Sequence, residues 1–377
     1  MPTVIIALIY TAIIMKLILF FLLPFLFVSI LRGQNNAPVA DINYLSNRFD
    51  AAKKEFGLYE KEHGRFVQTS NVLMHYLTWG KATGTPLIWV HGSLTNGYEL
   101  KQIANRLTDA GYYVIAIDYY GHGQTPIPMN EVSLYHVADD IKVLLDSLKI
   151  KKAVVGGFSR GGYISTAFYD AYPGRVLGLV LEDGGSVSSN TYFHKLSKPE
   201  LDNRINSFHK NIPKENYFDN QFEAYVSIYD TSDRGSQFEI LAWITKMRTG
   251  KWSICPGLMA LFNMADSNQY RDLVHHTTRA SLFGESMAMI EPKIVYRNLN
   301  VPVLILDPFG ENDPFPFEKE NIALQKQHPD RIKYVSYKNT EHNIHSFDPV
   351  NFVSDLADFL KAIKTPDSTY FTKSVSH

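Results

Sequence analysis

One serine lies in a turn that few folds can build. An apolar stretch at 153–156 runs straight into residues 157–161, Gly-Phe-Ser-Arg-Gly, and a helix-like segment follows. Gly157 and Gly161 stand two residues before and after Ser159, where a sharp strand-to-helix turn leaves no room for side chains. Such a turn lifts the hydroxyl above a sheet and directs the first N–H groups of the helix toward whatever it attacks. The pattern therefore predicts a nucleophile elbow with Ser159 at its tip.

Eight short, largely apolar runs predict the strands of a sheet. Several are apolar throughout, as strands buried on both faces of a parallel sheet are. Segments with helical spacing lie between them, and the alternation predicts an α/β fold with a mostly parallel, eight-stranded sheet flanked by helices. The predicted strands are 65–69, 72–79, 86–90, 112–117, 153–156, 176–181, 301–306 and 332–337, and the clearest helical segments are 100–110, 132–148 and 163–172.

The remaining segments predict additions to this core. Apolar residues at helical spacing within 41–56 predict an amphipathic helix before the first strand. After the sixth strand the strand pattern stops, which predicts an inserted helical cap. The predicted organisation is 1–33 as an export or anchor segment, 34–63 as linker and helix, 64–185 and 297–364 as the α/β core, 186–296 as the cap, and 365–377 as a tail.

The N-terminal segment has a character of its own. Residues 4–31 are almost wholly apolar, and roughly 20 helical residues suffice to cross a bilayer. Two interpretations are open: a membrane anchor that starts at Met1, or a signal peptide that starts at Met15, which we favour slightly although its cleavage site lacks the preferred small residue. Both predict an exported protein, in the cell envelope, in the periplasm or secreted, and an anchor would add the membrane as a partner.

Composition narrows the classes of partner. The chain has 37 Lys and Arg against 38 Asp and Glu, which argues against binding to nucleic acid. Aromatic residues make up 13% of the chain, which suits an apolar pocket and a small-molecule acyl substrate with an apolar or aromatic group. The single cysteine, Cys255, allows no internal disulfide. Neighbouring His275 and His276 would face ~100° apart on a helix, so we predict no metal site there, and no cofactor.

A serine hydroxyl needs a general base, and that base needs a carboxylate that orients it and supports its charge. His342 follows the last predicted strand, at the carboxyl edge of the sheet, where active sites of such folds collect. We therefore predict His342 as the base. His345, three residues further on, is the alternative and is expected to pack beside it.

Three aspartates compete for the role of the acid. Asp313 follows the seventh predicted strand and is our choice, so that Ser159, Asp313 and His342 would form the catalytic set. Asp307 lies at the tip of the same strand. Asp183 follows the sixth strand, from which a carboxylate can also reach the imidazole, and it is the main alternative acid.

Two backbone N–H groups are needed to stabilise a developing oxyanion. We predict that Arg160, directly after the nucleophile, supplies one, and that Ser93, in the loop after the third strand, supplies the other. His91 is expected to support that loop. The side chain of Arg160 has two interpretations: it attracts an acidic substrate or, as we favour, it pairs with Glu182 or Asp183.

These motifs together resemble the α/β-hydrolase fold family, in its cap-bearing esterase type. Outside the cap, the resemblance covers about Gly64 to Leu360. It is carried by the 91–92 loop, residues 118–125, the elbow, the 310–313 loop, and His342 with Pro349 and Phe352 downstream. The resemblance implies a serine hydrolase that cleaves a carboxylic ester or related acyl bond through an acyl-enzyme, without a cofactor. The alternative from another class is a ligand-binding or sensing protein of the same fold with slow or no turnover.

Overall fold

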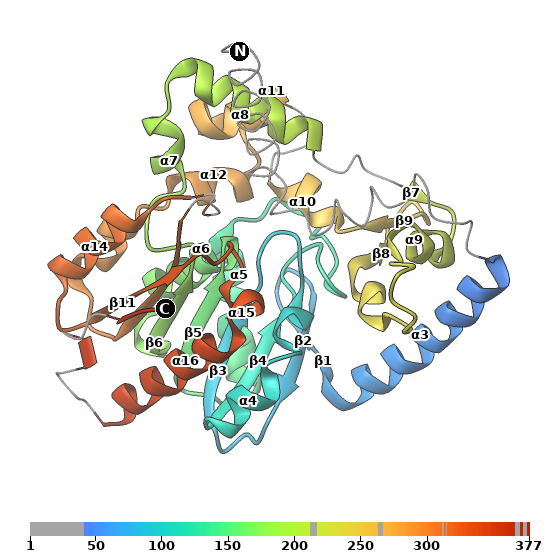
Figure 1. Ribbon diagram of the computed structural model, residues 1–377, viewed down its shortest axis with the longest axis horizontal. Coiled ribbons are helices and arrows are strands. Elements are labelled where there is room, and N and C mark those ends of the chain that lie inside the picture. The colour runs from blue at the N-terminus through green and yellow to red at the C-terminus, as the bar shows by residue number, and fades with distance from the viewer. Residues whose placement is uncertain are drawn as a thin grey trace, which may run out of the picture.

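A computed structural model describes residues 41–211, 217–262, 267–310, 313, 315–365, 370–371 and 375–377. Its centre is a nine-stranded sheet in which β2 runs against both of its neighbours and every other pair of adjacent strands is parallel (Figure 1). The strand order is β1 (Gly64–Gln68), β2 (Leu73–Trp79), β4 (Tyr112–Ile117), β3 (Thr85–Val90), β5 (Ala153–Phe158), β6 (Val176–Glu182), β10 (Val303–Phe309), β11 (Ile332–Lys338) and β12 (Val375–Ser376).

The predicted mostly parallel α/β sheet is confirmed, with one strand more than expected. Each of the eight predicted runs coincides with one of the strands from β1 to β11 in this sheet. The ninth strand, β12, lies in the segment predicted as a tail. It has two residues, too few to show a strand pattern, and it pairs with the end of β11.

Helices cover both faces of the sheet because its strands are apolar on both sides. Along β3, Ile88 and Val90 enter a core shared with α5 (Leu134–Ser147) and α6 (Arg160–Ala171). Leu87 and Trp89 alternate with them and enter the opposite core, shared with α4 (Ala104–Asp109) and α16 (Pro349–Lys364). The short elements η2 (Gly97–Leu100) and η3 (Pro173–Arg175), with α14 (Glu318–Gln327) and α15 (Ile344–Phe347), complete this part of the molecule.

The segment between β6 and β10 differs from the purely helical insertion that was expected. It contains a second, three-stranded sheet, whose strands of two or three residues are too short to show alternation in the sequence. Whether this segment acts as a cap stays a prediction. Its elements are α7 (Asn190–Lys195), α8 (Lys198–Asn211), β7 (Tyr217–Phe218), α9 (Gln221–Ile228), η4 (Phe238–Trp243), β8 (Ile244–Lys246), β9 (Trp252–Ile254), α10 (Pro256–Leu261), α11 (Ser267–His275), η5 (Thr277–Arg279), α12 (Leu282–Met289), α13 (Pro292–Val295) and η6 (Tyr296–Asn298).

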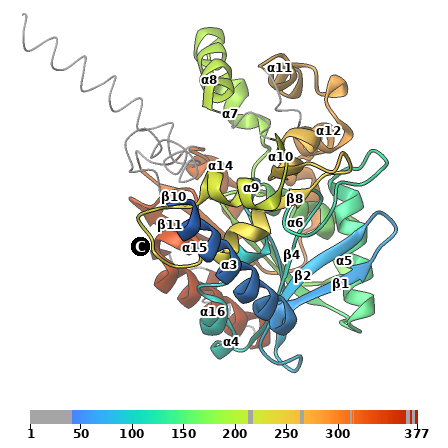
Figure 2. The same cartoon turned by 90° about the vertical axis from the view of Figure 1, so that its right-hand side faces the viewer.

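The first described helix, α3 (Ile42–His63), ties the small sheet to the large one. It continues beyond the predicted end at residue 56, through the exposed Gly57, and leads directly into β1. Its Leu45, Phe49 and Ala52 share a third core with residues around α9 and η4, including Tyr225. Figures 1 and 2 show α3 lying along the small sheet at one end and reaching β1 at the other.

A buried histidine anchors this helix to the α/β core. In β2, Nδ1 of His75 lies 2.6 Å from Oδ2 of Asp118, and its Nε2 lies 2.9 Å from Oε2 of Glu60 in α3. The other oxygen of Glu60 accepts a hydrogen bond from the hydroxyl of Tyr98. Burial lowers the pKa of His75, but the charge of Asp118 and the hydrogen bonds to both carboxylates outweigh it and raise the pKa to about 9. His75 is therefore an imidazolium at neutral pH.

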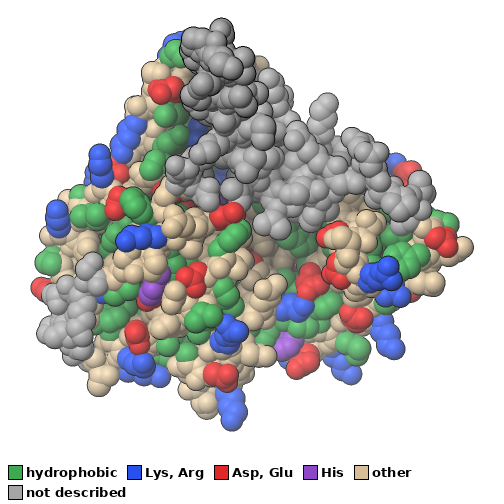
Figure 3. Space-filling model, viewed as in Figure 1, with side chains coloured by type: hydrophobic (Ala, Val, Ile, Leu, Met, Phe, Trp, Pro, Cys, Tyr) green, Lys and Arg blue, Asp and Glu red, His purple; other side chains and the backbone are tan. Residues whose placement is uncertain are grey.

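The predicted signal peptide or anchor at 1–33 lies outside the described residues and stays a prediction. In the part of the chain that the structure describes, no helix combines the length and the apolar character that crossing a membrane requires. On the face drawn in Figure 3, described acidic and basic side chains are interspersed.

Candidate active site

The elbow has the geometry that its sequence predicts. Ser159 directly follows β5, has φ 53° and ψ −119°, and precedes the first residue of α6. A side chain at Gly157 would lie 2.4 Å from the backbone of Gly161, and one at Gly161 would lie 1.9 Å from the carbonyl oxygen of Val90. The end of β6 also fixes the turn, because the N–H of Ser159 donates to the carbonyl of Glu182 over 2.8 Å. Only glycine fits at either flank.

His342 lies within hydrogen-bonding distance of the elbow serine. Its Nε2 is 2.9 Å from Oγ of Ser159, and its Nδ1 is 2.5 Å from Oδ2 of Asp183. The Asp183 side chain is fully buried and the His342 side chain is 13% exposed. The imidazole therefore spans a hydroxyl on one side and a carboxylate on the other, as general-base catalysis requires.

The acid that the structure places against His342 is Asp183, the alternative, and not Asp313. In Asp313, Oδ1 accepts the N–H of Phe315 over 2.7 Å, which holds the carboxyl within its own loop. Burial and the nearby charge of Asp183 raise the pKa of Asp313 to about 7, so a large fraction of it is protonated at neutral pH.

Two glycines bring Asp183 to the elbow. Asp183 has a positive φ of 42°, and Gly184 and Gly185 follow it. A side chain at Gly184 would lie 2.0 Å from the carbonyl oxygen of Ser159, and one at Gly185 would lie 2.2 Å from that of Gly162. The loop after β6 therefore packs directly on the elbow. The Gly-Gly pair after Asp183, at the end of a predicted strand, is a signal in the sequence that could have favoured this carboxylate.

Burial sets the resting charge of the base. It lowers the pKa of His342 to about 4, against the opposing charges of Glu182 and Asp313, so the imidazole is neutral at pH 7 and able to accept a proton. Burial also raises the pKa of Asp183, and the neighbouring charge of Glu182 adds to this effect. The contact with Nδ1–H of His342 opposes that rise, because it stabilises the carboxylate.

Asp307, the third candidate acid, lies behind this pair. It is 1% exposed, and its Oδ2 accepts the hydroxyl of Tyr334 over 2.9 Å. Burial raises its pKa well above the usual value, and the charges of Asp183 and Asp313 raise it further. Three carboxyls thus lie close enough to suppress one another's ionisation, and only Asp183 contacts a histidine.

The loop after β3 is supported by stacked rings. The ring of His91 stacks on that of Tyr119 with centroids 4.1 Å apart, and the hydroxyl of Tyr119 donates to the carbonyl of Gly92 over 3.2 Å. Nε2 of His122 lies 2.8 Å from the carbonyl oxygen of Ser93. Burial lowers the pKa of both His91 and His122, so both are neutral. His91 therefore supports the loop that carries Ser93, in agreement with its expected role.

The side chain of Arg160 lies over an aromatic ring of the insertion. Its guanidinium carbon is 4.1 Å from the centroid of Phe262. The two carboxylates proposed as its partners are each engaged by a histidine, Glu182 by His345 and Asp183 by His342. Burial lowers the pKa of Arg160 from 12.5, and the arginine in turn lowers the pKa of His342.

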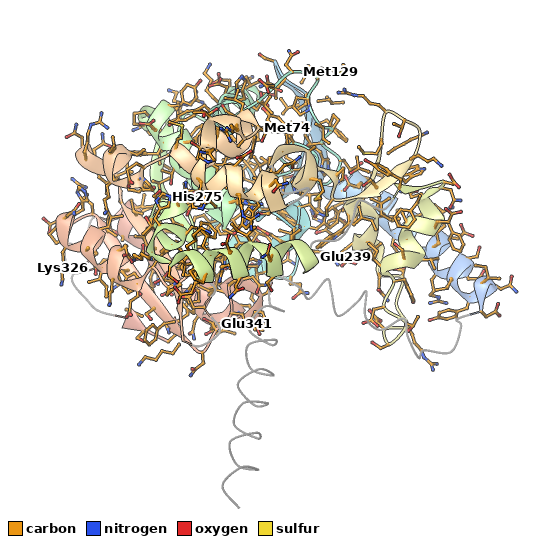
Figure 4. The ribbon with its side chains drawn as sticks, turned by 90° about the horizontal axis from the view of Figure 1, so that it is seen from above. Met74, Met129, Glu239, His275, Lys326 and Glu341 are labelled. Atoms are coloured by element: carbon orange, nitrogen blue, oxygen red, sulfur yellow. The ribbon has the colours of Figure 1, made fainter. Side chains whose placement is uncertain are left out.

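Two phenylalanines flank the base. The ring of Phe158, which precedes the nucleophile, lies 4.6 Å from the ring of His342, and the ring of Phe315 lies 5.5 Å from it. A side chain at Gly92 would lie 2.6 Å from Phe158, so this loop needs glycine at that position. Glu341, labelled in Figure 4, marks the loop that carries His342 as seen from the side of the insertion.

Sequence reasoning missed the ion pair between Glu182 and His345. Nδ1 of His345 lies 2.9 Å from both carboxylate oxygens of Glu182, and its N–H donates to the same carboxylate over 2.8 Å. His345 does pack beside the base, as expected, but Glu182 at the end of an apolar strand drew attention only as a partner for Arg160.

Within the described residues, no three or more His, Cys, Asp or Glu side chains are grouped so as to hold a metal ion. The rings of His275 and His276 have centroids 6.5 Å apart. The thiol of Cys255 has its pKa raised by burial to about 12 and is therefore a poor nucleophile.

Comparison with known proteins gives a match to one family. Residues 85–349 match the family model described as alpha/beta hydrolase fold. The "AB hydrolase superfamily protein YisY" of Bacillus subtilis is 27% identical over 135 residues, which cover 35% of this chain and 50% of that protein. The soluble epoxide hydrolase of a Corynebacterium species is 36% identical over 104 residues, 28% of this chain and 35% of that enzyme. The aligned regions thus span half or less of these relatives.

Solved structures are similar over more of the chain. A structure from a study of carboxylesterases of the thaumarchaeon Nitrososphaera gargenis aligns with a TM-score of 0.55 and 17% identity, over 80% of this chain and 100% of that one. A thermophilic esterase from Thermogutta terrifontis aligns with a TM-score of 0.51 and 19% identity, over 80% of this chain and 99% of that one. At these identities the likeness concerns the fold.

Proposed function

Because this chain belongs to the α/β-hydrolase fold family, we propose that it is a serine hydrolase that cleaves a carboxylic ester or a related acyl bond. The observation that carries the proposal is the unbroken series of contacts from Ser159 through His342 to Asp183. Family membership supports hydrolysis. The residue chemistry at the elbow supports the choice of an acyl bond.

In the first half of the proposed reaction, Oγ of Ser159 attacks the substrate carbonyl carbon while Nε2 of His342 accepts the hydroxyl proton. Asp183 stabilises the imidazolium that forms. The C–O bond to the alcohol then breaks, and His342 returns the proton to the departing oxygen. An acyl group remains as an ester on Ser159.

In the second half, a water molecule takes the place of the alcohol. His342 accepts a proton from this water, the resulting hydroxide attacks the acyl carbon, and the proton passes to Oγ of Ser159 as the ester bond breaks. The carboxylic acid leaves and the enzyme is restored. The neutral resting state of His342, which its lowered pKa supports, is the form that both halves need.

The oxyanion of each tetrahedral intermediate would be held by the backbone N–H groups of Arg160 and Ser93. Arg160 is the first residue of α6, where backbone N–H groups have no partner within the helix. Ser93 lies in a loop that His91, Tyr119 and His122 hold rigid. Donors that are fixed before the reaction cost no reorganisation when charge develops.

A serine at the elbow argues against epoxide opening, although three of the similar proteins are named as epoxide hydrolases. Opening an epoxide through a covalent ester intermediate takes a carboxylate nucleophile, and Ser159 supplies a hydroxyl. The aromatic rings of Phe158 and Phe315 beside His342 support a substrate with an apolar or aromatic acyl group. We extend the proposal to an exported enzyme, on the strength of the apolar segment at 4–31.

The test is covalent labelling of the full chain with a fluorophosphonate, followed by intact mass, and turnover of p-nitrophenyl esters of increasing acyl length. We expect one adduct, lost in Ser159→Ala, and turnover lost with it. Circular dichroism of Ser159→Ala should match that of the wild type, because only a hydroxyl at a turn is removed.

An unlabelled but folded wild-type protein would refute the serine hydrolase. If that protein were also stabilised by an apolar ester that it does not hydrolyse, the alternative of a binding or sensing protein would replace it. Labelling that persists in Ser159→Ala would place the nucleophile elsewhere.

A further inference from the structure

A cluster of charged groups lies beneath the proposed site, and none of the steps above uses it. It consists of Glu182, at the end of β6, His345, at the start of α15, and Glu99, in η2. The side chains of Glu182 and His345 are 0% and 4% exposed. Charges so deeply buried are costly unless they neutralise one another.

Glu182 connects two of the catalytic elements. Its carbonyl oxygen accepts the N–H of Ser159 over 2.8 Å, so its backbone is part of the elbow. Its carboxylate accepts the N–H of His345 over 2.8 Å and lies 2.9 Å from Nδ1 of the same residue. His345 is three residues after His342, so this ion pair anchors the loop of the base to the strand end that carries Asp183.

Glu99 connects the third element, the loop of the proposed oxyanion donor. Its Oε1 accepts Nε1–H of Trp89 over 2.5 Å, and its Oε2 accepts the N–H of Gly92 over 3.3 Å. Gly92 directly precedes Ser93. The position of this loop therefore depends on a carboxylate that lies close enough to His345 for each to shift the pKa of the other.

The three groups form one electrostatic unit. Burial lowers the pKa of His345, but the charge and hydrogen bond of Glu182 and the charge of Glu99 outweigh it and raise the pKa to about 9. Burial raises the pKa of Glu99 to about 7, and the charge of Glu182 contributes to that rise, whereas the charge of His345 opposes it. Other titratable groups face this unit: the charge of His345 lowers the pKa of His342, the charge of Glu182 adds to the raised pKa of Asp183 and of Tyr337, and the charge of Glu99 adds to that of Tyr119.

We propose that His345, held as an imidazolium by Glu182 and Glu99, is a positioning residue that keeps the His342 loop and the Ser93 loop in register with Ser159. The proposal rests on the proposed serine hydrolase function. His345 itself touches no reacting atom. When it loses its proton, the positive charge that offsets Glu182 and Glu99 is lost, and the elements that they hold are free to separate.

The test is the alkaline limb of the rate profile, measured with a p-nitrophenyl ester on the full chain and corrected for spontaneous hydrolysis. In the wild type we expect kcat to fall as pH rises through about 9, with little change in KM. His345→Gln should lower kcat by about 10- to 100-fold near neutral pH, since misplacing a catalytic group by 1 Å costs about that much, and should lack the limb.

A second variant keeps the test decisive if His345→Gln does not fold. Glu99→Gln retains an amide oxygen that can accept from Trp89 and Gly92, but it removes the negative charge that raises the pKa of His345. We expect its alkaline limb to move to lower pH. Glu239→Gln, which removes a partly exposed carboxylate in η4 that contacts Lys101, is the matched control and should leave the limb in place.

The outcomes separate the two proposals. If the wild type labels and turns over but Glu99→Gln has an unmoved limb, the positioning role of His345 is refuted and the serine hydrolase stands. If the wild type neither labels nor turns over, the hydrolase is refuted and the positioning role falls with it. A limb that shifts in Glu99→Gln and not in Glu239→Gln supports both.

Discussion

His342 and His75 each lie between two polar side chains, but one is neutral and the other is positively charged at pH 7. His342 has a hydroxyl, that of Ser159, on one nitrogen and a carboxylate on the other, and burial lowers its pKa to about 4. His75 has a carboxylate on each nitrogen, from Glu60 and Asp118, and its pKa rises to about 9. The carboxylates around His75 thus outweigh the effect of burial on its pKa, whereas burial dominates at His342.

Under the proposed function, histidine takes part in the reaction at one place and holds structural elements together at the other. A neutral imidazole can accept a proton, and the carboxylate on its far side supports the charge it gains. An imidazolium between two carboxylates has no proton to gain and holds its partners together. We therefore expect changes around His342 to affect turnover and changes around His75 to affect stability.

The largest effect on turnover is expected for Asp183, the carboxylate that contacts His342. Asp183→Asn should lower kcat by about 10⁴-fold, because the amide favours the wrong tautomer of the base. Asp313→Asn is the matched control, and a decrease below about tenfold is expected for it, because Asp313 contacts Phe315 and not His342. Steady-state kinetics on one ester would measure both. A larger loss in Asp313→Asn than in Asp183→Asn would reverse the assignment.

Replacing His75 should lower the free energy of unfolding. His75→Gln leaves two buried carboxylates without their cation, and breaking a buried ion pair in this way costs about 3–5 kcal/mol. Urea unfolding would measure the loss, with the exposed His275, labelled in Figure 4, changed to Gln as control; it should alter stability by about 0.5 kcal/mol or less. Labelling of Ser159 in the folded His75→Gln protein should persist. A His75→Gln protein that keeps its stability but loses the labelling would contradict the structural role of His75.

The two histidines should also differ in the sign of their pH dependence. The pKa of His75 is raised, so its stabilisation is complete below the ordinary value of about 6.5 and is lost as pH rises through about 9. The pKa of His342 is lowered, so its burial costs stability as pH falls from about 6.5 to about 4, and kcat should fall with a midpoint near 4 in the same range. Unfolding of wild type and His75→Gln from pH 6 to 10 would check the alkaline part. A stability difference that does not shrink with rising pH would contradict it.

The smallest effect is expected where an ion pair is partly exposed. Lys101 contacts Glu239 of η4, and their side chains are 28% and 37% exposed. Solvent screens such a pair, so Glu239→Gln should cost about 1 kcal/mol or less. Urea unfolding at low and high salt would measure this cost. A cost near that of His75→Gln would show that exposure does not separate the two kinds of ion pair.

Much of the fold could be predicted from the sequence, because strands and turns leave patterns among residues that are close together in the chain. Each strand predicted from an apolar run coincides with an observed strand, and Gly157 and Gly161 indicated the elbow. The strands of the small sheet were not found, since two or three residues show no period. The end of α3 was misplaced because Gly57, an unfavourable helix residue, lies in its interior.

Part of the candidate site could be predicted for the same reason, that its sequence patterns are local. Ser159 and His342 each follow a strand in a recognisable setting, whereas three aspartates met the same positional criterion for the acid. Glu182 and His345 gave no signal as a pair, because they are 163 residues apart along the chain. Partners so distant are joined only by the packing of the sheet.

By itself, the sequence determined the class of sheet, the elbow and the identity of the residue at its tip, because these depend on neighbours within a few positions. Only the tertiary structure shows which of Asp183 and Asp313 contacts His342. That contact depends on how closely the loop after β6 packs on the elbow, which is a property of residues that meet in space.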